Sequence, residues 1–116
     1  MFAVIFSDGE IKLDDLKNDC REHLWIPIAV HKDRNGSVTV LCFNEADTAK
    51  RFAKRNIPKT WVHGAVLLND DQIAFINSKR WKIEVLGFPR IFRDNPDQVL
   101  GFEIVEFSEK PGMKYA

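Results

Sequence analysis

The side chains best suited to chemistry in this sequence are basic residues interleaved with tryptophan. They are Lys50, Arg51, Lys54, Arg55, Lys59 and Trp61 in one segment and Lys79, Arg80, Trp81 and Lys82 in another. Ammonium and guanidinium groups bind carboxylates and phosphates, and indole rings stack on bases. We therefore expect a binding surface for an acidic macromolecule. An acidic protein partner is preferred to RNA or single-stranded DNA, and the chain offers no sign of a membrane partner.

The charges are unevenly distributed, although the chain has 17 basic and 17 acidic residues and is formally neutral. Residues 48–69 contain five basic residues and no acidic one, and residues 78–93 contain five basic residues and one acidic one. Residues 8–22 and 94–110 are predominantly acidic. The two basic segments form one patch if they are neighbours in space. The alternative is an ordinary solvated helix face balanced by acidic neighbours.

No recognised catalytic or metal-binding pattern occurs in the sequence. The histidines, His23, His31 and His63, are scattered, and Cys20 and Cys42 form no CxxC pair. In the hairpin predicted below, His31 and Cys42 lie two pairs apart, too far for a base and a nucleophile. We expect no cofactor, no metal and no catalysis; an enzyme with an unrecognised site remains a third hypothesis.

Two adjacent acidic pairs, Asp14-Asp15 and Asp70-Asp71, are interpreted as residues of helix starts. Neighbouring side chains on a helix diverge by about 100° and do not converge on one atom. Carboxylates in a first turn also interact favourably with the helix dipole.

The length of 116 residues fits a single domain that folds without disulfides. The apolar runs are too short to span a membrane. Asp8 and Glu10 interrupt the start of the chain, and no cationic region precedes its apolar run, unlike a secretory signal. We therefore expect a cytosolic protein with reduced thiols.

Hydrophobic periodicity predicts alternating strands and helices over residues 1–68. The expected elements are a strand at 1–6, a helix from Leu13, strands at 25–31 and 37–43, a helix capped by Asn44 and ending before Pro58, and a strand at 60–68. Asn35-Gly36 predicts a two-residue hairpin loop. That loop would place Val30 opposite Leu41 and His31 opposite Val40.

The second helix is expected to bury one narrow side and expose its cations. Its inward residues are Ala46, Ala49, Phe52 and Ala53. Asp47 and Arg51 have the spacing of an i, i+4 ion pair.

The C-terminal third is predicted to extend this core. Asn69 to Gln72 has the form of a capping box and favours a short helix over 70–79, although Ile73, Phe75 and Ile76 would also suit a strand. Two strands, Lys82–Phe88 and Val99–Phe107, are expected to form a hairpin across the loop Pro89–Gln98. Ser108–Ala116 is expected to be a flexible tail.

The order over residues 1–68 is β-α-β-β-α-β, and it resembles ferredoxin-like domains, including the RNA recognition motif. The similarity is clearest over Asn35–Ala53. It implies an antiparallel sheet with helices on one face. RNA recognition motifs stack bases on strand aromatics, whereas this chain has Val38 and Val40 at the third-strand positions and Phe2 on the first strand.

The sheet face away from the two helices would be apolar in this arrangement. Its residues would be Ala29, His31, Val38, Val40 and Cys42. Because soluble monomers seldom expose a patch of that size, we expect the C-terminal extension to cover it, or alternatively a partner or a second copy that pairs through the sheet face.

The sequence thus predicts one α+β domain over residues 1–116. It would have a ferredoxin-like core at 1–68, an extension at 69–107 and a tail at 108–116. The expected function is non-catalytic binding or regulation, of the inhibitor or adaptor type, with nucleic-acid binding through the same basic surface as the alternative.

Overall fold

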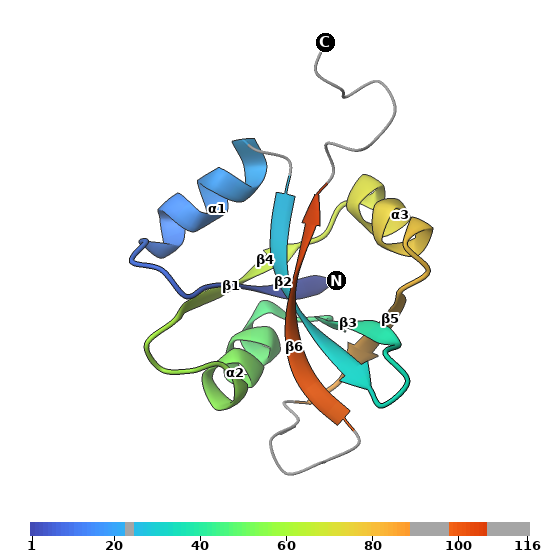
Figure 1. The fold of residues 1–116 in the computed structure, drawn as a ribbon. Coiled ribbons are helices and arrows are strands. Elements are labelled where there is room, and N and C mark those ends of the chain that lie inside the picture. The colour runs from blue at the N-terminus through green and yellow to red at the C-terminus, as the bar shows by residue number, and fades with distance from the viewer. Residues whose placement is uncertain (23–24, 89–97, 107–116) are drawn as a thin grey trace.

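Six β-strands and three α-helices make up the described part of the chain, which is residues 1–22, 25–88 and 98–106 of a computed structural model (Figure 1). The elements are β1 (Phe2–Ser7), α1 (Leu13–Glu22), β2 (Trp25–Asp33), β3 (Val38–Phe43), α2 (Ala46–Asn56), β4 (Val62–Leu67), α3 (Asp70–Ser78), β5 (Lys82–Leu86) and β6 (Gln98–Glu106). The predicted α+β class is confirmed.

Three inner strands, β1, β2 and β3, meet pairwise at the centre of the sheet. Each gives one edge to an outer strand: β1 pairs antiparallel with β4, β2 antiparallel with β6, and β3 parallel with β5. Each divides its other edge between the two remaining inner strands. The pairs that join them include Ile5–Ile28, Ala3–Cys42 and Val30–Val40. All six of these side chains are fully buried in one cluster.

This pairing does not confirm the ferredoxin-like strand order. The sheet follows the path β4-β1-β2-β3-β5, with β6 on the outer edge of β2. In Figure 1 the β2–β6 pair runs across β1. The two-stranded ribbon of β2 and β6 therefore runs in a different direction from the β1–β4 pair.

The helices cover both faces of the sheet, so the expectation of helices on one face is wrong. A Cβ atom at Gly64 on β4 would lie 2.6 Å from Leu13 Cδ1 of α1, whereas the next residue, Ala65, belongs to the buried cluster of Phe52 on α2. Successive residues on a strand point to opposite faces. Ile76 of α3 belongs to the cluster on the α1 side. We call the side of α1 and α3 the first face and the side of α2 the second face.

The β2–β3 hairpin turns through three residues, one more than the two-residue loop predicted from Asn35-Gly36. Asp33 Oδ1 accepts hydrogen bonds from the backbone N–H groups of Asn35 and Ser37, both at 2.9 Å. Gly36 has a φ of 83°, and its N–H donates to the Asp33 carbonyl at 3.1 Å. The Asp33 carboxylate thus stabilises a longer turn than the dipeptide alone indicates.

The longer turn shifts the pairing register by one residue. Val30 lies opposite Val40 and His31 opposite Thr39, so the predicted pairs of Val30 with Leu41 and of His31 with Val40 are wrong. A one-residue shift exchanges which side chains share a face. Val30 and Val40 therefore lie together on the first face, and His31 lies on the second.

The start of α2 also differs from the prediction. The N-cap is Glu45, without a side-chain capping bond, and not Asn44. The reason is that the first helical hydrogen bond here runs from the Ala49 N–H to the Glu45 carbonyl, at 3.2 Å. The helix ends as expected before Pro58, where the Ile57 N–H donates to the Ala53 carbonyl at 2.8 Å.

The capping box predicted before α3 is confirmed. Asn69 Oδ1 accepts from the Gln72 N–H at 2.8 Å, and Gln72 Oε1 accepts from the Asn69 N–H at 2.9 Å. These reciprocal bonds begin a helix that extends to Ser78, and the alternative of a strand over this segment is excluded.

The predicted hairpin between the last two strands is wrong. β5 pairs with β3, and β6 pairs with β2 along its whole length. β2 and β3 each have one outer edge that needs a strand partner, because their other edges pair with inner strands. The stretch from α2 through α3 provides the long connection that the parallel β3–β5 pair requires.

The residues of the surface expected to need cover divide between the two faces of the sheet. Val40 and Cys42 are buried in one cluster with Ile76 of α3, and Ile83 of β5 packs against that cluster. Ala29 is buried on the second face instead, where its strand neighbour is β6.

Some predictions concern residues outside the described part. The predicted tail Ser108–Ala116 lies there, as does most of the predicted loop Pro89–Gln98. Within the described ranges, no helix is long and apolar enough to cross a membrane.

Gly36→Ala is expected to destabilise the protein by about 1 kcal/mol, because a residue with a Cβ is strained at positive φ. Nothing lies within 4 Å of the added atom, so the effect is one of backbone conformation. Gly87→Ala is the matched control, because Gly87 also faces open space but has no positive φ. Urea unfolding measures both variants, and equal stabilities would contradict the strained turn.

Candidate functional site

Helix α2 presents a row of cations to solvent because its other side is fixed in the core. Ala49, Phe52 and Ala53 are fully buried, as predicted, and the Phe52 ring centroid lies 5.2 Å from that of Phe43 on β3. The helical period places the charged residues outward. These exposed residues are Lys50, Arg51, Lys54 and Arg55.

None of the four cations forms an ion pair with a described carboxylate. No described carboxylate lies within ion-pair distance of them, and the expected pair between Asp47 and Arg51 does not form. An ion pair does join Lys32 on β2 to Glu103 on β6. Lys54 and Arg55 occupy the last turn, where cations interact favourably with the helix dipole. The row is therefore a positively charged surface on a helix anchored in the core.

The residues that follow α2 divide between solvent and core. Lys59 is exposed and extends the positive surface. Trp61 is half-buried, with its ring centroid 5.8 Å from that of Phe6 and 4.8 Å from that of Phe102. The Phe6 and Phe102 rings are themselves 4.8 Å apart. Trp61 therefore contributes to an aromatic cluster that joins β1, β4 and β6.

The second basic group lies where α3 leads into β5. Lys79, Arg80 and Lys82 are exposed. Lys79 Nζ lies 5.4 Å from the ring centroids of both Phe75 and Trp81, a cation–π arrangement. Arg80 has a φ of 63° immediately after the helix. Trp81 packs against the core on the first face.

The structure separates the two basic groups that the sequence suggested as one patch. α2 packs on the second face, whereas α3 and Trp81 pack on the first. Figure 1 shows α2 and α3 on opposite sides of the inner strands. The residues from Lys50 to Lys59 thus form one surface around α2, and the residues from Lys79 to Lys82 form another around the end of α3.

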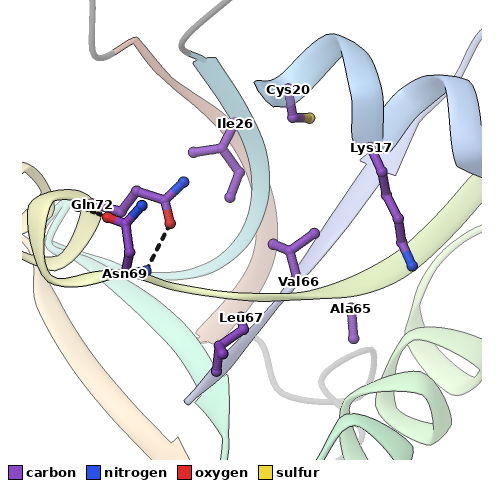
Figure 2. A pocket seen from close by; sticks show the side chains of 8 residues that line it. All are labelled: Lys17, Cys20, Ile26, Ala65, Val66, Leu67, Asn69 and Gln72. Carbon is purple, nitrogen blue, oxygen red and sulfur yellow. Dashed lines mark hydrogen bonds between the residues drawn. The ribbon is translucent and has the colours of Figure 1, made fainter. Parts of the chain in front are cut away.

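A cavity of about 330 Å³ lies beside β4, between α1 and the start of α3 (Figure 2). It is lined by Lys17, Cys20, Ile26, Ala65, Val66, Leu67, Asn69 and Gln72. Burial, reinforced by Asp19, raises the pKa of Cys20 to about 11, so its thiol is protonated at neutral pH. The Asn69 and Gln72 side chains already bond to the α3 capping box. The lining groups offer one positive charge and hydrogen bonds but no general base.

Sequence reasoning did not find this cavity, because its lining combines residues that are distant along the chain. One local signal did place part of it, because the capping box located Asn69 and Gln72.

The structure also locates the residues considered for catalysis. Cys42 is fully buried, and burial raises its pKa to about 11. His31, opposite Thr39, lies on the other face of the sheet from Cys42, so the two do not form a base and nucleophile. Both acidic pairs lie in the first turns of α1 and α3, as expected. Among the described residues, no group of three His, Cys, Asp or Glu side chains could hold a metal ion.

Comparison with protein-family models, with curated proteins and with solved structures finds no match to this chain. The resemblance to the RNA recognition motif stays an expectation from the sequence pattern. Arguments about function therefore depend on the surfaces described above.

The environment of His63 disfavours the charged form of its imidazole. It lies on β4 opposite Phe6. Its Nδ1 atom is buried and has no hydrogen-bond partner among the described residues. Burial lowers the pKa of His63 from its usual 6.5.

The free energy of unfolding is expected to fall as the pH drops below about 6.5, because the unfolded chain then binds a proton that folded His63 resists. Above that pH His63 is neutral in both the folded and the unfolded chain, so its contribution to the free energy of unfolding no longer changes with pH. His63→Gln, which cannot titrate, should flatten the stability profile between about pH 8 and pH 5. Parallel profiles for the two proteins would contradict this role.

Proposed function

We propose that this protein is a small non-catalytic binding or regulatory protein of the inhibitor or adaptor type. It engages an acidic protein partner through the exposed basic face of α2. The observation that supports this is the row of four exposed cations that form no ion pair with a described carboxylate, on a helix whose opposite side is fully buried. Cations one helical turn apart are about 5.4 Å apart along the axis. That spacing fits carboxylates displayed on a folded partner.

The environment of the aromatic residues favours a protein over a nucleic acid as the binding partner. Single-strand binding combines cations with rings on which bases stack. Here Trp61 is engaged with Phe6 and Phe102, and Trp81 lies beneath Lys79. Helices pack on both faces of the sheet, so the described strands lack the helix-free face of an RNA recognition motif.

RNA or single-stranded DNA remains the second candidate for the same surface. Phosphates would contact the α2 cations without base stacking, so binding would be independent of sequence. Such binding weakens steeply as salt rises, because neutralised phosphates release counterions.

Lys54→Glu combined with Arg55→Glu is expected to abolish capture of the partner when the tagged protein is used for affinity purification from a lysate of the cells that encode it. The double variant reverses two of the four charges that meet the partner, and like charges across an interface oppose binding. Each preparation is analysed for both protein and nucleic-acid content. An acidic protein that is retained by the wild type and lost from the variant supports the proposal.

The matched control is Lys12→Glu combined with Arg34→Glu. Both residues are exposed, lie outside α2 and give the same change of net charge. Circular dichroism checks that both double variants fold. Equal retention by the α2 variant and the control would overturn the proposal, and retention of nucleic acid alone would favour the second candidate.

A further inference from the structure

Strand β5 is an outer strand with an apolar, exposed margin. Within the described residues it pairs only with β3, so no described strand occupies its other backbone edge. Val85 on β5 is 45% exposed, and Phe88 just beyond it is 65% exposed. An exposed edge with apolar side chains is a template for pairing with another strand.

We propose that two copies of this chain pair through β5. The strands run antiparallel about a two-fold axis at Ile83 and join the two sheets into one. This arrangement places Ile83 opposite Ile83 of the second copy. Lys82 then lies opposite Glu84 of the second copy, and by symmetry Glu84 lies opposite Lys82.

The charges select this register among those that antiparallel self-pairing allows. Residues that face each other must lie on the same face of the sheet, so the axis passes through a residue rather than between two. An axis at Glu84 would bring two carboxylates together, which is unfavourable. An axis at Val85 would leave Lys82 without a cross-strand partner on β5. The axis at Ile83 makes two opposite-charge pairs at once.

The same register covers the exposed apolar side chain. One residue before the strand, Trp81 lies opposite Val85 of the second copy. Trp81 packs on the first face, and Val85 shares that face because it is two residues from Ile83. The pairing thus combines backbone hydrogen bonds, two ion pairs and aromatic–aliphatic contacts, each a recognised contribution to strand association.

Strand β4 offers a contrasting outer edge. It also ends in an exposed apolar residue, Leu67. A two-fold axis there would keep each helix on its own face and bring α2 beside α2 of the second copy, because α2 packs against β4. The exposed cations of both helices would then repel. Pairing through β5 avoids this repulsion between α2 helices, because the helix that directly precedes β5 in the chain is α3 and not α2.

Pairing through β5 goes beyond the proposed function and does not depend on it. The two α2 helices would lie on the same face of the joined sheet. A partner with two acidic sites could then bind both copies with increased avidity.

Sedimentation of the purified full chain tests the pairing. The mass should rise from 13.4 kDa towards twice that value between about 10 μM and 1 mM protein. A pair of five-residue strands makes a small interface, so a Kd on the order of micromolar or weaker is expected. In the same samples, hydrogen exchange of β5 backbone amides should slow as the protein concentration rises.

Charge exchange tests the register. Lys82→Glu places two pairs of carboxylates together and Glu84→Lys places two pairs of ammonium groups together, so each should weaken pairing at least about tenfold. Mixing the two single variants should restore dimers, since every facing pair is then of opposite charge. The double variant with both substitutions should also dimerise. Lys12→Glu, distant from β5, should dimerise like the wild type.

A monomer at every concentration would overturn the proposal. So would a Lys82→Glu variant that dimerises as tightly as Lys12→Glu, because the contact would then lie elsewhere. If Glu84→Lys does not fold, the comparison of Lys82→Glu with Lys12→Glu and the hydrogen exchange of the β5 amides still decide the outcome.

Discussion

The mutual pairing of β1, β2 and β3 is the contact on which the rest of the structure depends. Each inner strand divides one edge between the other two, through Ile5–Ile28, Ala3–Cys42 and Val30–Val40. Three strands cannot all pair with one another in a flat sheet, so the strands diverge around a shared centre. Six fully buried side chains fill that centre. The backbone groups on the remaining edges require partners, and β4, β6 and β5 provide them.

This arrangement also determines where charge reaches the surface. Strands whose both faces are apolar need cover on both sides. α1 and α3 cover one face, and α2 covers the other. The basic residues of α2 and those at the end of α3 are separated for this reason. A surface that looked continuous along the sequence becomes one cationic helix and a smaller group in which Lys79 rests on two aromatic rings.

Local signals predicted the elements well, because they depend on neighbours in the sequence. The period of Ala49, Phe52 and Ala53 gave the buried side of α2 and hence its exposed cations, and the Asn69–Gln72 box predicted α3. Pairing partners were harder, because strands with two apolar faces fit several sheets. The hairpin register changed because the Asp33 carboxylate binds Ser37 and lengthens the turn. Nothing local indicates that β5 should pair with β3, or that β6 should pair with β2.

The most direct test of this account is a set of cross-strand nuclear Overhauser contacts in one sample of the full chain. The structure predicts contacts between Ile5 and Ile28, between Ala3 and Cys42, and between Val30 and Val40. All three must occur together if the inner strands meet as described. Contacts of Val30 with Leu41 in place of Val40, or the absence of contacts between β1 and either of its two inner neighbours, would contradict it.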